Sequence, residues 1–299
     1  MADHAFTVTD REYLRHGEAS FLARIYLPEG QGPFPCIVEV HGGGWSQFDR
    51  LRGKHLHEAL ARSGCTVVAL DFRQGAEGAY PGSVADVHYA IRWVKAHAAE
   101  LKTAPDLVGV SGNSSGGHLA MLISMRPEDP RYAALPVDGP AHDARVRCVV
   151  MLWPVINPYG RYHYAKSALT LPEPPRWPNM IIPMHDAYWG DEAAMAEGSP
   201  LLILERGEPA ELKPALWVQS NQDKVHNYRD PTSSFGGTES DRFAQAYRRA
   251  GGDIETFYFD EPMKFTGAHA ELPESTGALQ KVVSFVHHHI PTPAKSEAA

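Results

Sequence analysis

The sequence is poor in cysteine and has no long apolar run. Only three of the 299 residues are cysteine, and Cys36, Cys65 and Cys148 lie far apart, without the C-x-x-C spacing of a zinc site. Each falls in an apolar segment, so we expect three buried free thiols. No stretch of about 18 apolar residues is present, which excludes a membrane-spanning helix.

Positive charge is also scarce. The chain has 28 lysine and arginine residues against 36 aspartate and glutamate residues, a formal net charge of −8. This balance gives no electrostatic reason to expect a nucleic acid or an anionic membrane as a partner, and a small neutral or mildly polar substrate fits it better. The polar segment MADHAFTVTDREYLRHGE lacks the apolar stretch of a signal peptide, so we expect a cytoplasmic protein.

Metal-binding patterns are missing as well. There is no H-E-x-x-H motif, and the histidines form no ligand set with a recognisable spacing. His55 and His57 are two positions apart and would point in different directions on a helix. The run His287, His288 and His289 is interpreted as a polar turn of the last helix. We therefore expect no metal and no other cofactor.

What is present is the composition of an ordinary globular protein. Hydrophobic residues make up 43% and charged residues 21% of the chain, and 299 residues suit one domain with a large core. Short apolar runs alternate with segments of helical period, which predicts an α/β fold with a mostly parallel sheet covered by helices on both faces. The predicted strands are 36–40, 65–71, 107–110, 146–152, 215–220 and 254–259.

The remaining segments complete this pattern. Residues 11–27 predict an antiparallel hairpin at the sheet edge, because apolar residues alternate with others near its end. Between about 155 and 211 the pattern gives way to proline, tryptophan and tyrosine, and we predict a small cap insertion there within a single domain 1–299. The predicted helices, most with an apolar stripe, are 54–63, 83–101, 117–125, 238–250 and 276–290.

A serine lies at a turn between a predicted strand and a predicted helix. The segment 112–116, GNSSG, matches G-x-S-x-G, the elbow that exposes a nucleophilic serine. The residues two before and two after the nucleophile must be small, because strand and helix approach each other closely. Glycine meets this requirement only around Ser114, since Ser111 and Ser115 would each place Asn113 at a small position. Ser114 is the predicted nucleophile.

A glycine-rich turn follows the predicted strand 36–40. Its sequence, HGGGW at 41–45, lets backbone N–H groups converge on a negative oxygen without obstruction by side chains. We assign the N–H groups of Gly43, Gly44 and Ser115 as donors to the oxyanion of a tetrahedral intermediate.

With these two motifs the chain resembles the HGGG-type α/β-hydrolases, that is, the hormone-sensitive-lipase-like carboxylesterases and their feruloyl esterase, acetylxylan esterase and arylformamidase relatives. VALDFR at 68–73, AYP at 79–81 and ADVHYAIRWV at 85–94 are similar to the D-Y-R, P, D and W positions of that family. The resemblance extends more loosely from about residue 30 to 290 and implies the α/β-hydrolase fold. Two segments depart from the family pattern: NSS replaces D-S-A at 113–115, and FRQG replaces Y-R-L-A at 72–75.

The resemblance also implies an acid and a base. In this fold both follow the nucleophile, the acid after a late strand and the histidine near the end. Asp223 follows the predicted strand 215–220 in a segment that resembles the family's G-x-x-D-x-x-V position. His269 lies where the family places its base, and it is the only histidine between the predicted strand 254–259 and the last helix. Alternatives for the acid are Asp230, Glu239 and Glu205.

Aromatic residues are candidates for the substrate pocket. Trp45 directly follows the oxyanion glycines, with Phe48 close behind it, so we expect both at the mouth of the active site. Together with Trp189 of the predicted cap they are the predicted substrate-binding residues, and they suggest a partly apolar cavity for a short acyl or aromatic group. The other aromatic residues of the predicted cap are Tyr159, Tyr162, Tyr164, Trp177 and Tyr188.

The predicted function is hydrolysis of a small-molecule carboxylic ester through an acyl-enzyme, without nucleic acid or membrane partners. An amidase or arylformamidase would use the same triad, and a non-catalytic small-molecule-binding protein on a hydrolase fold is a more distant alternative. Because an exposed last strand often pairs with its copy in this fold family, we also expect a homodimer.

Overall fold

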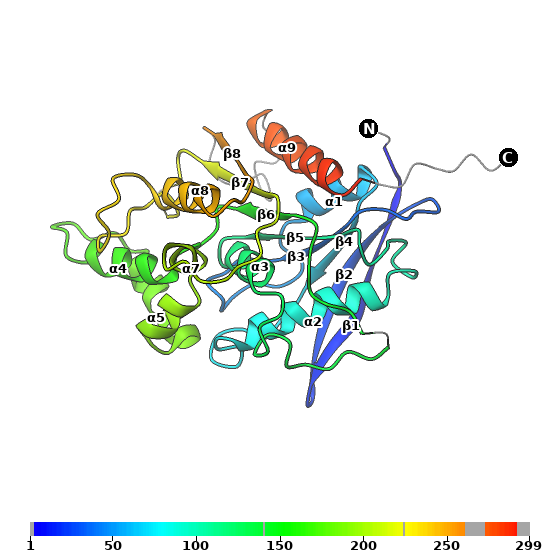
Figure 1. Ribbon diagram of the computed structural model, residues 1–299, viewed down its shortest axis with the longest axis horizontal. Coiled ribbons are helices and arrows are strands. Elements are labelled where there is room, and N and C mark those ends of the chain that lie inside the picture. The colour runs from blue at the N-terminus through cyan, green and yellow to red at the C-terminus, as the bar shows by residue number, and fades with distance from the viewer. Residues whose placement is uncertain (1–2, 140, 224, 261–272, 292–299) are drawn as a thin grey trace.

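The computed structural model describes residues 3–139, 141–223, 225–260 and 273–291, and within them one sheet runs through the molecule (Figure 1). Its strands are β1 (Phe6–His16), β2 (Ala19–Pro28), β3 (Cys36–Val40), β4 (Thr66–Leu70), β5 (Val108–Asn113), β6 (Val149–Leu152), β7 (Ala215–Ser220) and β8 (Ile254–Phe259). They lie in the order β1-β2-β4-β3-β5-β6-β7-β8. The β1-β2 and β2-β4 pairs are antiparallel, and every later pair is parallel, as the sequence predicts.

Burial explains why the central strands are visible in the sequence. Every residue of β3, β4, β6 and β7 is buried, as expected of parallel strands covered on both faces. Within the described sheet β1 pairs with β2 alone and is mostly exposed, so its sequence is polar. The hairpin is longer than the predicted 11–27, because β1 already begins at Phe6.

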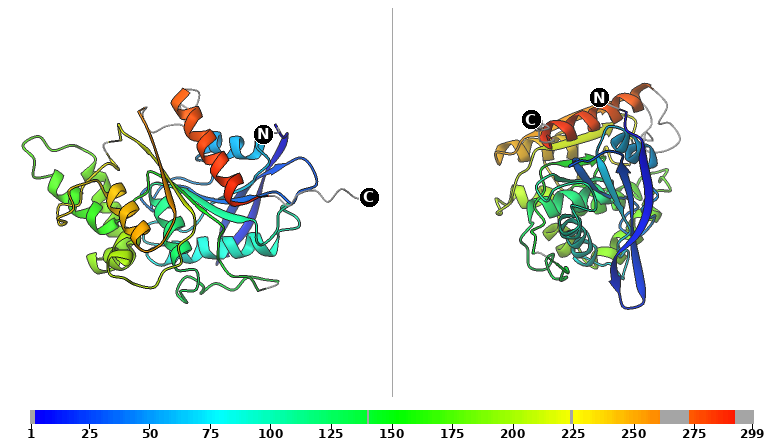
Figure 2. Two further views of the ribbon diagram at one scale, coloured as in Figure 1. Left: turned by 45° about the horizontal axis from the view of Figure 1, so that its top comes forward. Right: turned by 90° about the vertical axis from the view of Figure 1, so that its right-hand side faces the viewer.

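Helices cover both faces of the sheet (Figures 1 and 2). α1 (Lys54–Arg62) and α9 (Pro273–His289) pack on one face; α2 (Gly82–Ala96), α3 (Ser115–Met125) and α8 (Glu239–Arg249) pack on the other. Alternate strand side chains supply the two cores: Val38 and Val40 belong to the core under α2 and α3, whereas Ile37 belongs to the core under α1 and α9. The predicted α/β architecture is confirmed.

The alternation of strand and helix stops between β6 and β7, where the sequence predicts an insertion. This segment contains α4 (Pro158–Ala168), α5 (Pro178–Trp189), α6 (Glu192–Glu197) and α7 (Pro200–Glu205). Three of these helices have proline at their first position, where a backbone N–H would have no acceptor within the helix. The prolines therefore begin short helices. Figure 1 shows α4 and α5 at the end of the molecule away from the chain's N-terminus.

The three cysteines are buried and free, as predicted. Burial raises the pKa of each thiol and so keeps it protonated. The run 287–289 forms the last turn of α9, as predicted, and Nε2 of His287 lies 2.9 Å from Oγ of Ser63.

Candidate active site

Ser114 occupies the turn between β5 and α3. Its φ of 53° and ψ of −120° lie in a region that residues with a Cβ rarely adopt. The turn is tied to the neighbouring segment after β6: the N–H of Ser114 donates to the carbonyl of Leu152 at 2.9 Å, and its carbonyl accepts from the N–H of Val155 at 3.0 Å. The local geometry is the strand-turn-helix that the G-x-S-x-G motif predicts.

Close backbone packing explains the two glycines of this motif. A Cβ on Gly116 would lie 2.0 Å from the carbonyl oxygen of Val40, and a Cβ on Gly112 would lie 2.4 Å from the backbone of Gly116. Both distances are far below van der Waals contact. A larger residue at either position would therefore force β3, β5 and α3 apart.

A histidine from another loop contacts Ser114. Nε2 of His226 lies 2.9 Å from Oγ of Ser114, and Nδ1 of the same ring lies 2.7 Å from Oδ2 of Asp223. Because an ionised carboxylate can only accept, Nδ1 carries the proton and donates it to Asp223. Nε2 is then free to accept the hydrogen of the Ser114 hydroxyl. The three side chains form one continuous row of hydrogen bonds.

Four donors hold the carboxylate of Asp223. Oδ1 accepts the backbone N–H groups of Val225 at 2.9 Å and His226 at 3.1 Å, and Oδ2 accepts Nε2 of Gln219 at 3.0 Å in addition to Nδ1 of His226. Burial by itself raises the pKa of Asp223, but the charge of His226 and these hydrogen bonds outweigh burial and lower the pKa. Asp223 is therefore ionised at neutral pH.

Burial has the opposite consequence for His226. Withdrawing the ring from water lowers the pKa of His226; Asp223 partly opposes this effect, and the positive charge of Arg161 adds to it. The pKa stays below the usual value, so the ring is neutral at neutral pH. A neutral imidazole is the form that can accept a proton from a serine hydroxyl.

His269, the histidine predicted as the base, lies outside the described residues. The sequence prediction does not include His226, because the motif order of this fold places the base after β8. The available signal is the D-x-x-H spacing at 223–226. An aspartate can bond to the backbone of the turn that follows it, which brings a side chain three residues later within reach.

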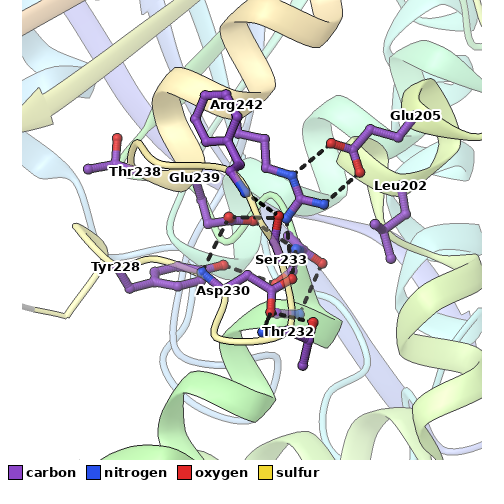
Figure 3. A network of polar contacts seen from close by, with 12 residues as sticks. Leu202, Glu205, Tyr228, Asp230, Thr232, Ser233, Thr238, Glu239 and Arg242 are labelled. Carbon is purple, nitrogen blue, oxygen red and sulfur yellow. Dashed lines mark hydrogen bonds and ion pairs between the residues drawn. The ribbon is translucent and has the colours of Figure 1, made fainter.

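The carboxylates considered as alternative acids have a different partner. Glu205, Asp230 and Glu239 lie 2.6, 3.2 and 3.3 Å from the guanidinium nitrogens of Arg242 (Figure 3). Nδ2 of Asn157, at the start of α4, donates to Glu239 at 2.7 Å. This network joins α4, α7 and α8 to the loop after His226, and Asp223 is the carboxylate among the described residues that contacts His226.

The glycine-rich turn lies against the turn at Ser114. The N–H of Trp45 donates to Oγ of Ser115 at 3.1 Å. Gly43 and Gly44 have φ of 113° and 62°, in the left-handed region that favours glycine. Among the described residues no acceptor receives the N–H groups of Gly43, Gly44 or Ser115, so all three are available to a ligand.

The BD-FAE family model matches residues 24–229, well over half of the chain. This span includes Ser114, Asp223 and His226. The chain belongs to the BD-FAE family.

Two proteins of Mycobacterium tuberculosis are similar to this BD-FAE chain in sequence. "Probable carboxylic ester hydrolase LipM" is 32% identical over 166 residues, which cover 54% of this chain and 38% of LipM. "Esterase LipC" is 31% identical over 196 residues, which cover 64% of this chain and 45% of LipC. The chain therefore spans less than half the length of these curated relatives.

Solved esterase structures share the fold. The thermostable carboxylesterase EstE1 from a metagenomic library superimposes with a TM-score of 0.71 at 22% identity, covering 97% of this chain and 91% of EstE1. The hyperthermophilic esterase of Pyrobaculum calidifontis has a TM-score of 0.71 at 20% identity, covering 94% and 85%. The predicted α/β-hydrolase fold is confirmed.

The aromatic residues predicted to bind substrate lie in two environments. Trp45 and Trp189 are 1% and 4% exposed and meet edge to face, with ring centroids 5.5 Å apart. Phe48 is 48% exposed, and the guanidinium of Arg52 lies 3.9 Å from its ring centroid. The BD-FAE chain thus buries both tryptophans in its interior and leaves Phe48 at the surface. Their contact with substrate stays a prediction.

A chain of hydrogen bonds fixes Trp45 in the interior. Its indole Nε1 donates to Nδ1 of His118 at 3.2 Å, and Nε2 of His118 donates to the carbonyl of Gly198 at 2.8 Å. Burial lowers the pKa of His118 to about 4, so the ring is neutral and can accept the indole N–H. The glycine-rich turn is thereby connected through α3 to the end of α6.

Two absences concern only the described part of the chain. No helix there combines the length and apolar character that crossing a bilayer requires. No group of three or more histidine, cysteine, aspartate or glutamate side chains is placed there to hold a metal ion.

Proposed function

We propose that this BD-FAE chain is a serine hydrolase that cleaves small-molecule carboxylic esters. Ser114 is the nucleophile, His226 the general base and Asp223 the carboxylate of the triad. The row of contacts from Ser114 Oγ through the His226 ring to Asp223, at 2.9 and 2.7 Å, carries the proposal. The sequence similarity to mycobacterial proteins named as ester hydrolases supports it. The BD-FAE match over 24–229 also supports it.

In the acylation step, Nε2 of His226 takes the proton of the Ser114 hydroxyl while Oγ attacks the ester carbonyl carbon. Asp223 keeps the ring oriented and stabilises the imidazolium that forms. The N–H groups of Gly43, Gly44 and Ser115 donate to the negative oxygen of the tetrahedral intermediate. Collapse breaks the bond to the leaving alcohol, which receives the proton from His226, and the acyl group stays on Ser114.

Deacylation repeats these roles with water. Neutral His226 takes a proton from a water molecule, and the oxygen of that water attacks the acyl carbon. The second tetrahedral intermediate uses the same three N–H groups. Its collapse releases the carboxylic acid and returns the proton to Ser114.

We propose that 155–211 forms a cap within the single domain 1–299. The segment begins beside the nucleophile, since the N–H of Val155 donates to the carbonyl of Ser114. Its helices also contain Trp189, which with Trp45 and Phe48 stays the proposed set of substrate-binding aromatic residues.

We also propose that the protein acts in the cytoplasm without nucleic acid or membrane partners. β8 is the last strand at one edge of the described sheet and exposes Tyr258. An unpaired edge favours pairing with a second copy, so β8 is the proposed homodimer contact.

The test is release of p-nitrophenol from acetate, butyrate and octanoate esters. Ser114→Ala, confirmed as folded by circular dichroism, should lose at least about 10³-fold in kcat. Ser111→Ala is the matched control, because its hydroxyl is buried nearby in β5 without a hydrogen-bond partner among the described residues. It should keep the wild-type rate.

Retention of activity in Ser114→Ala would show that another group is the nucleophile. A higher kcat/KM for a matched anilide or formanilide than for the ester would change the assignment to an amidase or arylformamidase. Absence of turnover in the wild type on every ester and anilide would favour a binding protein.

A further inference from the structure

Arg161 is a buried arginine on α4 that forms no ion pair with any described residue. Only 2% of its surface is exposed, and Nε and Nη1 are buried without a hydrogen-bond partner. Among the described residues it forms no ion pair or cation–π contact. A guanidinium in the interior without an acceptor is strongly unfavourable, because it loses its hydration and gains nothing in exchange.

A second buried arginine shows the usual solution. Arg242, 8% exposed, forms ion pairs with Glu205, Asp230 and Glu239 (Figure 3). The described residues therefore supply three carboxylates as ion-pair partners to one buried arginine and none to the other. This difference indicates that the acceptor of Arg161 comes from outside the described chain.

Arg161 lies in the first turns of a helix that begins beside the nucleophile. The segment that leads from β6 into α4 is hydrogen-bonded to Ser114. The carbonyl of Asn157, the N-cap of α4, accepts both the N–H of Arg161 at 2.9 Å and the hydroxyl of Tyr228 at 3.0 Å. Tyr228 is two residues after His226. The start of α4 is thus fixed between the nucleophile turn and the loop that carries the base.

The positive charge of Arg161 also interacts with His226 and Asp223. It adds to the lowering of the His226 pKa, of which burial is the largest cause. Burial likewise lowers the pKa of Arg161, and the nearby charge of Asp223 opposes this effect. Asp223 is not the missing acceptor, because both its oxygens already receive hydrogen bonds from Gln219, Val225 and His226.

We propose that Arg161 binds a carboxylate of the substrate, so that the preferred esters carry a negative charge on the acyl group or on the leaving group. A carboxylate accepts two parallel N–H groups from the planar guanidinium and supplies the missing opposite charge. This inference rests on the proposed ester hydrolysis and deepens it. Arg161 is a residue that sets specificity, and the proton transfers remain with His226.

Paired substrates test the proposal. In one arm, mono-p-nitrophenyl glutarate is compared with p-nitrophenyl hexanoate, a neutral ester of similar length. In the other arm, the acetyl ester of p-hydroxybenzoate is compared with phenyl acetate. In at least one arm the wild type should have a higher kcat/KM for the anionic ester. Arg161→Gln should lower kcat/KM for that ester by about 10²-fold and change kcat/KM for the neutral ester by less than about threefold.

Two further variants calibrate the result. Arg161→Lys keeps the charge without the planar fork and should recover part of the preference. Lys166→Met removes an exposed cation from the same helix; Nζ of Lys166 lies 3.0 Å from Glu192. This variant should leave kcat/KM unchanged for the charged and for the neutral ester. If Arg161→Gln does not fold, inhibition of the wild type tests the proposal instead. Glutarate should inhibit hydrolysis of the neutral ester competitively, and neutral glutaramide should not.

Equal losses on the charged and the neutral ester in Arg161→Gln would overturn the proposal and show that Arg161 supports the catalytic residues. A wild type without preference in either arm, and without inhibition by glutarate, would also overturn it. These results differ from failure of the proposed function, in which the wild type would cleave none of the four esters.

Discussion

Different kinds of contact hold the turn of the proposed nucleophile Ser114, the nucleophile turn, and the loop of the proposed base His226, the base loop. The turn at Ser114 is fixed by backbone atoms that approach so closely that Gly112 and Gly116 cannot carry a Cβ. The loop with Asp223 and His226 is fixed by side chains. Gln219 donates to Asp223, and the network around Arg242 holds the later part of the loop at Asp230 (Figure 3).

That second network gathers residues from distant parts of the sequence. Asn157 precedes α4, Glu205 ends α7, Asp230 lies in the base loop, and Glu239 and Arg242 lie on α8. A steric requirement leaves glycines at fixed spacing in one short segment. A polar network leaves no local pattern, because each partner is recruited from a different element. The two regions should therefore respond differently to substitution.

The largest effect is expected at the base. His226→Gln keeps a polar side chain of similar size but cannot take the proton from Ser114, so kcat should fall by about 10³-fold or more. The measurement is kcat for p-nitrophenyl butyrate, with folding checked by near-ultraviolet circular dichroism.

His269→Gln is the matched variant at the histidine predicted from sequence. Under the proposed mechanism it should keep kcat within about tenfold of the wild type. The reverse pattern, in which His269→Gln is inactive and His226→Gln active, would assign the base to His269.

The base loop should be sensitive to the loss of its buried cation. Arg242→Met leaves Asp230 and Glu239 buried without their ion-pair partner and should destabilise the fold by about 3 kcal/mol. Urea unfolding measures the change. Arg131→Met, at a surface ion pair with a 44% exposed side chain, should cost less than about 1 kcal/mol. Equal effects would show that the buried network adds no particular stability.

The nucleophile turn should be intolerant of a single methyl group. Gly116→Ala places a Cβ against the carbonyl of Val40 and should destabilise the protein by at least about 2 kcal/mol, measured by urea unfolding. Gly277→Ala is the control, since a Cβ there meets no atom within 4 Å. In helix α9 it should be neutral or stabilising by up to about 1 kcal/mol. A stable and active Gly116→Ala would contradict the steric explanation.

The smallest effect concerns pH. Burial lowers the pKa of His226, so the ring stays neutral at neutral pH, and kcat/KM for a neutral ester should fall only when the pH drops through that lowered pKa. Removal of the nearby positive charge in Arg161→Gln makes protonation of His226 easier, so the acid limb should move to higher pH. An unchanged limb would show that Arg161 does not act on His226.

The sequence by itself determined the parts of this protein that depend on neighbouring residues. The runs at 36–40 and 215–220 match strands β3 and β7, because parallel strands buried on both faces are mostly apolar. The run at 254–259 matches β8, which lies at the sheet edge and is only partly buried. The glycines around Ser114 mark the turn, since a close backbone approach excludes any side chain. The α/β architecture follows from the same local patterns.

Only the tertiary structure decided which distant side chains meet. It brings His226 to Ser114, 112 positions earlier in the sequence, and it places Trp45 in the interior, where His118 accepts its indole N–H. It also buries Nε and Nη1 of Arg161 without an acceptor among the described residues. Such contacts depend on the packing of loops and inserted helices, and their side chains show no periodicity from which burial or partners could be inferred.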